Sequence, residues 1–335
     1  MRSGKLLLGL MAAGSVASSA GAQTPTPKLL VKENDTIIGM GSLTAMTFIQ
    51  IIDSGVWTTF IDTDFLDTSR DGAILRNGFV TLREGATLFS PPNASLDEWV
   101  SISLTSKGDL GMLVKVKDAS GIYDGAYWNL LPVTFKDAII DSPLLGANSD
   151  WEKLEVIKMN ANNTMLILGE IQNTAIGGAT SKEDALVRYQ LDNLGNIVST
   201  TVLATKGMNV PVMGTTVNFL GSTEHIISLN SRGDYFTVVQ GVGVNALLIN
   251  LEHLVAQEGN PSPVPGTFWR TVTLAKVALN DRGDFLVSGS LLGDQNTYLI
   301  ARGSLDDVSN QQKFVQAGDI LPAFSTQPLA NGSSA

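Results

Sequence analysis

The sequence predicts an all-β protein, a β-propeller built from about five four-stranded repeats. A hairpin motif recurs along the chain, and a second, polar-ended strand motif alternates with it. We find no amphipathic helix of convincing length. Four short antiparallel strands in roughly 57 residues approximate the period of a propeller blade, so we expect five or six blades.

The first motif is an apolar run, then Asn, two polar residues, Gly-Asp and a second apolar run. It is clearest at 277–287 and 226–236, and weaker at 102–110, 156–166 and 49–56. The fourth motif position is held by Gly55, Gly108, Asn163, Gly233 and Gly283. Gly and Asn both tolerate a positive φ, so the motif predicts hairpin turns rather than a set of calcium ligands.

The second motif is a short apolar strand that ends in a polar turn. Its copies lie at 82–88, 204–209, 256–260 and 315–322, with a degraded one at 135–138. A further copy at 28–38 precedes the first repeat, where it either completes the ring or belongs to a partial sixth blade. For the fifth repeat we expect strands at 271–279, 284–290, 297–302 and 313–316.

The N-terminus has the features of a secretory signal peptide. Arg2 and Lys5 precede a short apolar stretch, and Ala20-Gly21-Ala22 provides a cleavage site. We therefore expect a signal peptide at 1–22, a flexible lead-in at 23–27, the propeller at 28–324 and a loose tail at 325–335. The mature chain would be exported to the periplasm or the cell exterior, without a transmembrane segment.

The repeats resemble those of exported bacterial tandem-repeat proteins with an Asn-x-x-Gly-x-x-Ala-Phe repeat and, often, a variable C-terminal anchor. Asn280-x-x-Gly283, Asn230-x-x-Gly233 and the Gly318–Pro322 stretch carry the resemblance. Leu286-Val287 replaces Ala-Phe in the best copy, and we expect no anchor segment. The resemblance implies export and a propeller-like β fold, and it implies no activity.

Composition excludes several functions. The net charge of −10 argues against nucleic acid as a partner. The absence of Cys removes disulfides, thiolate metal sites and a cysteine nucleophile. The two histidines, His225 and His253, are expected at strand edges rather than as catalytic bases. We expect no cofactor other than calcium. Its candidate ligands are the carboxylates of an acidic loop, Asp62, Asp64, Asp67 and Asp71. The alternative is that this loop is solvated and binds no ion.

Aromatic residues suggest a ligand-binding face. In a four-stranded blade, the loops between blades share a face with the loops between the second and third strands. The loops at 62–72, 118–125 and 172–184 would lie there. The candidate ligand contacts are Trp99, Trp151, Trp269, Phe219, Tyr123, Asp124, Tyr127 and Trp128. Aromatic rings among carboxylates suit a sugar ring. The alternative is that the tryptophans pack between blades.

Three functions follow as hypotheses. The first, which the scarcity of catalytic motifs favours, is a non-enzymatic exported binding or scaffold module for an extracellular or envelope polymer, such as a glycan, or for a protein. The second is a carboxylate-based glycan hydrolase or lyase on the same face. The third is a surface component that self-assembles through exposed edge strands.

Overall fold

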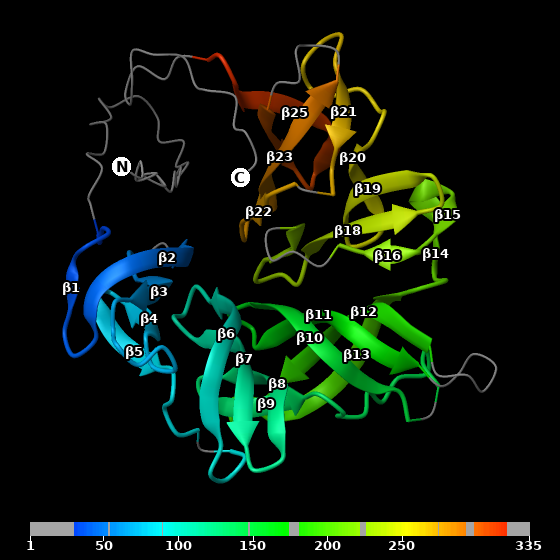
Figure 1. Ribbon diagram of the computed structural model, residues 1–335. Helices are drawn as coiled ribbons and strands as arrows, with labels where there is room; N and C mark the ends of the chain where they lie inside the picture. The colour runs from blue at the N-terminus through cyan, green and yellow to red at the C-terminus, as the bar shows by residue number, and fades with distance from the viewer. Residues whose placement is uncertain are drawn as a thin grey trace.

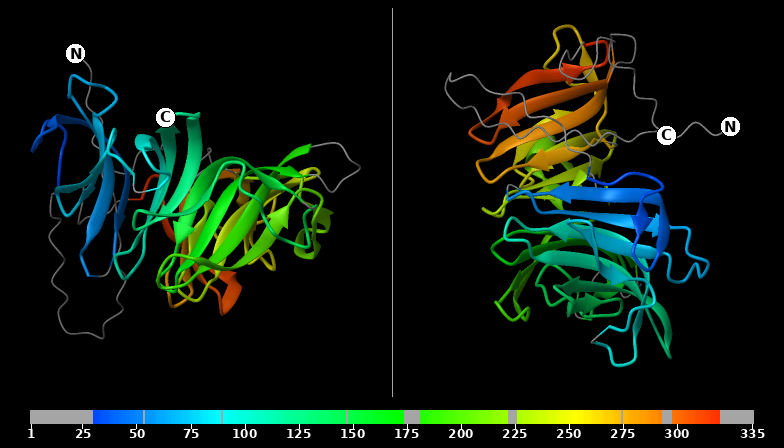
Figure 2. Two further views of the ribbon diagram at one scale, coloured as in Figure 1. Left: turned by 90° about the horizontal axis from the view of Figure 1, so that it is seen from below. Right: turned by 90° about the vertical axis from the view of Figure 1, so that its left-hand side faces the viewer.

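The structure is a computed structural model that describes residues 30–52, 54–88, 90–146, 148–173, 181–221, 226–273, 275–292 and 298–319. Five antiparallel sheets follow one another around a common centre, as Figure 1 shows, and each is one propeller blade. Figure 2 shows the same blades from two further directions. The expected signal peptide, lead-in and tail lie outside the described residues, as does His225.

The first three blades have four consecutive strands each. Blade 1 contains β2 (Gly41–Ile51), β3 (Trp57–Thr63), β4 (Gly72–Arg76) and β5 (Phe79–Arg83), with β1 (Thr36–Ile37) paired to β2. Blade 2 contains β6 (Ser95–Leu104), β7 (Leu110–Asp118), β8 (Gly121–Trp128) and β9 (Leu131–Phe135). Blade 3 contains β10 (Asp150–Met159), β11 (Thr164–Asn173), β12 (Ser181–Leu191) and β13 (Ile197–Thr205).

In blades 4 and 5 the first strand is divided into two short pieces that pair with the same second strand. Blade 4 contains β16 (Phe219–Leu220), β17 (Ser228–Leu229), β18 (Tyr235–Gly241), β19 (Val244–Ile249) and β20 (His253–Gln257). Blade 5 contains β21 (Phe268–Thr271), β22 (Val277–Leu279), β23 (Asp284–Leu292), β24 (Tyr298–Ser304) and β25 (Asp307–Gln316). A small hairpin, β14 (Asn209–Val210) and β15 (Thr215–Thr216), with the 3₁₀ turn η1 (Pro211–Met213), joins blades 3 and 4.

The Asn-x-x-Gly motifs form the turns between first and second strands, as the sequence predicts. The fourth motif residue has a positive φ in all five copies, between 58° at Asn163 and 91° at Gly233 and Gly283. In the best copies the backbone N–H of this residue donates to the carbonyl of the first, as in Gly283 to Asn280 at 3.1 Å. A Cβ atom is disfavoured at this φ, Gly has none, and Asn adopts the left-handed region more readily than most residues, which explains why Gly and Asn occupy the position.

The second motif forms the link from a fourth strand into the next blade. Its turn residue has a positive φ and donates its N–H to the first strand that follows, as Gly85 does to Leu96 and Gly259 to Trp269, both at 2.8 Å. Asn34 makes the same bond to Leu43 at 2.9 Å. The copy at 28–38 is therefore the link that leads into blade 1, and its strand β1 pairs with β2 of that blade.

Apolar side chains fill the spaces between successive blades. One buried cluster joins blades 1 and 2, a second joins blades 2 and 3, and a third extends through blades 3, 4 and 5. Side chains on the innermost strands add polar contacts between blades. The Leu104 N–H donates to Gln50 Oε1 at 2.6 Å, the Met159 N–H to Ser103 Oγ at 2.8 Å, and the Leu279 N–H to Ser228 Oγ at 3.1 Å. These bonds connect the innermost strands of neighbouring blades.

The strands expected for the fifth repeat agree with the structure except at the first. We expected one strand at 271–279, whereas β21 ends at Thr271 and β22 begins at Val277. The apolar content of this stretch does not reveal the interruption. The backbone leaves the ladder near Val272, whose N–H donates to the Glu258 carboxylate at 3.1 Å instead of to β23.

Candidate functional site

The propeller has two faces with different loops. We call the face with the links between blades the loop face; it includes 84–95, 136–150, 205–217 and 258–268. We call the opposite face the turn face; it carries the Asn-x-x-Gly turns. The predicted ligand contacts were assigned to the loop face, so their positions and exposure decide which of them a ligand could reach.

The three predicted tryptophans lie between blades with little exposed surface. Their exposed fractions are 6% for Trp99, 0% for Trp151 and 2% for Trp269. Trp151 and Trp269 occupy equivalent positions, because the carbonyl of each accepts the N–H of the preceding link turn. Trp99 lies three residues beyond the equivalent position, Leu96. The Trp151 indole donates to the Tyr189 hydroxyl at 2.8 Å, and these contacts agree with the packing alternative.

The aromatic residues of β8 do not share one surface. Tyr127 is fully buried, and its hydroxyl donates to the Ser90 carbonyl in the link to blade 2 at 2.9 Å. Trp128 ends β8 at the turn face, where it packs against Gly195 in a turn of blade 3. Its assignment to the loop face was wrong, because it lies at the far end of an eight-residue strand from the loop at 118–121.

Tyr123 and Asp124 lie in the half of β8 nearer the loop face and are half-buried. Burial, together with the hydrogen bond that its hydroxyl donates to the Asp118 carboxylate, raises the pKa of Tyr123 to about 12. Asp124 accepts the N–H of Leu154 in the next blade at 3.0 Å, and burial raises its pKa above the ordinary value. Tyr123 is therefore a neutral hydroxyl at physiological pH, and Asp124 holds two blades together.

Sequence reasoning missed a second carboxylate of this kind. Asp184 on β12 accepts the N–H of Leu220 in blade 4 at 2.9 Å, and burial raises its pKa as well. Both aspartates precede a small residue and an apolar one, Asp124-Gly-Ala and Asp184-Ala-Leu. That shared pattern on the third strand was the signal available in the sequence.

Of the four aspartates predicted as calcium ligands, Asp62 and Asp71 interact through their charges, whereas Asp64 and Asp67 accept hydrogen bonds from different residues. Asp64 accepts the Ser42 N–H at 2.6 Å, and Asp67 accepts the N–H and hydroxyl of Ser69. Burial, and then the charge of Asp71, raise the pKa of Asp62. Within the described ranges, no three Asp, Glu, His or Cys side chains form a group able to hold a metal ion. The calcium site stays a prediction.

A buried carboxyl group that the prediction omitted lies against this loop, at the end of β5. Glu84 is 8% exposed, and its carboxyl accepts the Gly72 N–H at 2.9 Å. Burial, together with the negative charges of Asp71 and Asp62, raises its pKa to about 7. A Cβ at position 72 would meet the Glu84 carboxyl carbon at 2.6 Å, so Gly72 makes room for this group.

Exposed aromatic side chains on the loop face come from blades 4 and 5. Phe219 at the start of β16 is 50% exposed, and the Lys206 ammonium lies 6.0 Å from its ring centroid. Phe268 at the start of β21 is 42% exposed and pairs across the sheet with Leu292, which is also exposed. Val242 in the turn after β18 is exposed as well. We call Phe219, Val242, Phe268 and Leu292 the blade 4–5 apolar surface.

A groove of about 200 Å³ lies between the outermost strands of blades 4 and 5. Trp269 lines it, as do Ala256 of β20 and Val308 and Gln311 of β25. The Gln311 amide donates to the Val255 carbonyl at 2.5 Å and so ties the two blades together. Trp269 is thus a predicted aromatic contact that borders this groove.

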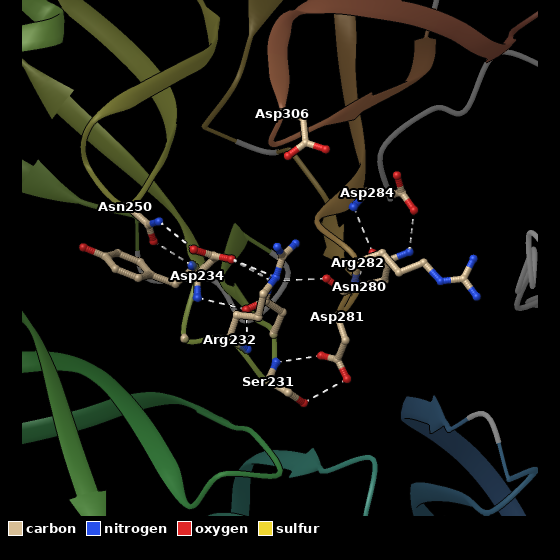
Figure 3. Close-up of polar contacts among 12 residues, drawn as sticks. Ser231, Arg232, Asp234, Asn250, Asn280, Asp281, Arg282, Asp284 and Asp306 are labelled. Atoms are coloured by element: carbon tan, nitrogen blue, oxygen red, sulfur yellow. Dashed lines mark hydrogen bonds and ion pairs between the residues drawn. The ribbon is translucent and has the colours of Figure 1, made fainter.

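On the turn face, the Asn-x-x-Gly turn of blade 4 is hydrogen-bonded to the turn between β19 and β20 of the same blade. Figure 3 shows Asn250 beside Asp234, and the Asn250 amide donates to the Asp234 carboxylate at 3.0 Å. Burial opposes the charge of Asp234, but hydrogen bonds from Asn230 and Asn250 and the nearby Arg232 and Arg188 lower its pKa.

The Asn-x-x-Gly turns also contact one another in sequence around the ring. The side-chain amide of Asn160 donates to the Asn230 carbonyl at 2.8 Å, and the side-chain amide of Asn230 donates to the Asn280 carbonyl at 3.2 Å. Ser231 donates both its N–H and its hydroxyl to Asp281, as Figure 3 also shows. The motif residues therefore serve structure, in agreement with the interpretation of the motif as a turn.

Comparisons with known proteins give no family. No family model matches the chain, and no curated protein matches it. Among solved structures, a polysaccharide lyase, Uly1, is similar with a TM-score of 0.38 and 11% identity over 79% of this chain and 59% of that one. A protein of unknown function from Bacteroides caccae has a TM-score of 0.30 and 13% identity over 76% and 75% of the two chains. This chain thus spans under two thirds of the lyase, and similarity this low gives no argument about activity.

Among the described residues, no helix has the length and apolar character needed to cross a bilayer.

Proposed function

We propose that the protein is an exported binding module of the tandem-repeat type, which recognises an extracellular or envelope polymer through its loop face. The observation that carries the proposal is the blade 4–5 apolar surface. Phe219 and Phe268 expose aromatic rings at the loop-face ends of adjacent blades. Aromatic side chains of this kind bind sugar rings through their apolar faces, and they are also frequent in protein interfaces.

The rigid surroundings of these rings support recognition without a large rearrangement. Both phenylalanines begin strands that pair with a central strand of their blade. The Leu220 N–H next to Phe219 is held by Asp184, and the Phe268 link is closed by a bridge from Pro261. A surface fixed in this way loses little conformational entropy when a ligand binds.

The test is binding to a panel of polysaccharides, with calcium and with chelator, using residues 23–335. We expect Phe219→Ala and Phe268→Ala each to weaken binding about tenfold, which corresponds to about 1.4 kcal/mol. Phe79→Ala is the matched control, because Phe79 is 76% exposed on the outermost strand of blade 1. If the unmodified protein and the three variants bind a polymer of the panel with equal affinity, the assignment of the site is contradicted.

A carboxylate-based glycan hydrolase or lyase is the second candidate. It is favoured by Glu84, whose pKa burial raises to about 7, because a carboxyl group that is protonated near neutral pH can act as a general acid. Burial also raises the pKa values of Asp124 and Asp184 above their ordinary value. Release of shortened sugars, lost in Glu84→Gln or Asp184→Asn while binding persists, would favour this function. Binding with no product from any polymer on the panel would exclude it for those polymers.

A further inference from the structure

The outermost strand of blade 3 lacks the protection that the other outermost strands have. β13 has nine residues, Ile-Val-Ser-Thr-Thr-Val-Leu-Ala-Thr, with no charge and no proline. Among the described residues it pairs only with β12, so its other edge is open. Open strand edges attract another strand unless charge, proline or a covering group blocks them.

Each of the other outermost strands has such a device. β5 contains Arg83, and β25 contains Asp307 and Lys313. β9 has five residues and contains Pro132, which cannot donate a backbone hydrogen bond. β20 is contacted at Val255 by the Gln311 side chain of the next blade. β13 is the exception among the five.

Exposed aliphatic side chains adjoin the open edge. Leu194 and Val198 are 75% and 66% exposed, and Ile197 and Leu131 are also exposed. Leu131 belongs to blade 2 and lies against Gly195, so the patch extends across the junction of blades 2 and 3. We call Leu131, Leu194, Ile197 and Val198 the blade 2–3 patch. Contiguous exposed apolar groups beside an open edge mark an interaction surface.

We propose that β13 pairs antiparallel with β13 of a second copy of this chain, which makes a two-fold symmetric dimer. The opposite charges at its two ends favour a second copy as the partner. The net charge of −10 opposes contact between copies elsewhere, and β13 is a stretch of the chain that carries no charge. Its ends carry opposite charges, with Asp192 before the strand and Lys206 after it. Antiparallel pairing brings the Lys206 end of one copy near the turn that follows Asp192 in the other copy.

The strand geometry limits the register. Bulges in the pairing of β12 with β13 fall at Val198 and Leu203, which leaves 199–202 as the regular stretch. A two-fold axis through Thr200 or Thr201 places Lys206 opposite residue 194 or 196 of the second copy. That turn is where the Asp192 carboxylate accepts the N–H groups of Leu194 and Asn196. The regular stretch is short, so the blade 2–3 patch supplies much of the buried apolar area.

This dimer is independent of the proposed ligand surface, which lies on blades 4 and 5. The test is sedimentation equilibrium of residues 23–335 over a range of concentrations. We expect the mass to rise toward that of a dimer with concentration. Val198→Lys should raise the dissociation constant at least about tenfold, because it places a positive charge in the apolar contact. Phe79→Lys is the matched control at an equally exposed outer strand, and its dissociation constant should equal that of the unmodified protein.

Two results would overturn the proposal. One is a monomer mass at every concentration up to about a hundred micromolar, a range in which weak interfaces still associate. The other is a dimer that Val198→Lys and Phe79→Lys leave equally intact. Lys206→Glu adds a separate readout, since it should weaken the dimer most at low salt, where charge repulsion is least screened. Circular dichroism of each variant confirms that it is folded.

Discussion

Replacing Glu84 with glutamine should change how the stability of the protein depends on pH. In the folded protein burial and the charges of Asp71 and Asp62 raise the Glu84 pKa from 4.5 to about 7. In the unfolded chain the carboxyl group returns to its ordinary pKa. Between these two values the folded state holds a proton that the unfolded state has released, so the free energy of unfolding falls as pH rises. The glutamine side chain of the variant cannot titrate, and it can still accept the Gly72 N–H.

The expected magnitude follows from the difference between the two pKa values. Each unit is worth about 1.4 kcal/mol, so a difference of about 2.5 units corresponds to about 3 kcal/mol. Glu84 is 8% exposed, so little of this is lost to screening by solvent. Relative to the unmodified protein, Glu84→Gln should gain about 3 kcal/mol between pH 4 and pH 8. Most of the gain falls between pH 5 and 7.

Urea unfolding at pH 4, 5, 6, 7 and 8 measures this difference, with Glu252→Gln as a control because Glu252 is exposed. The difference in unfolding free energy between the Glu84→Gln variant and the unmodified protein should increase with pH, while that of the control stays constant. A difference that is constant across the range, or that decreases with pH, would refute the argument that Glu84 is destabilised as an anion by burial beside Asp71.

Three further changes test the contacts between blades. Trp151→Ala should lower the free energy of unfolding by about 3–5 kcal/mol in urea denaturation, because it empties a fully buried site. Ser103→Ala should cost about 1–3 kcal/mol, because the buried N–H of Met159 loses its acceptor, whereas the exposed Ser199→Ala should change stability by under about 0.5 kcal/mol. Asn230→Ala should lower the melting temperature, since this side chain donates into the next turn and accepts the N–H groups of its own; an unchanged melting temperature would contradict its structural role.

The architecture was predictable because its signals are local. Gly233 and Gly283 mark turns whose φ a residue with a side chain resists, and that requirement is visible in the sequence wherever the turn recurs. The copy at 28–38 was recognised for the same reason, although its place as the link into blade 1 needed the pairing of β1 with β2. The interruption between β21 and β22 was missed, because an apolar run does not reveal where a ladder hydrogen bond is lost.

The candidate site was harder to predict, because exposure is not a local property. Trp151 and Trp269 have the residue type and the spacing of a ligand platform, but the neighbouring blades bury them. Phe219 was placed among the tryptophans by the same spacing, and it is half exposed. Phe268, beside Trp269, was overlooked, although it presents its ring to solvent where its neighbour does not. Alternation along a strand explains this contrast, since successive side chains point to opposite faces of the sheet.

The sequence by itself determined the turns, the repeat and the all-β architecture of this protein, because each follows from the φ that Gly or Asn permits and from the alternation of apolar residues within one repeat. The packing of the blades against one another sets which side chains lie between blades, which carboxyl groups are buried and which strand edge stays open. Those properties depend on residues about fifty positions apart, such as Ser103 and Met159, or Asn230 and Asn280, which the closing of one blade against the next brings into contact.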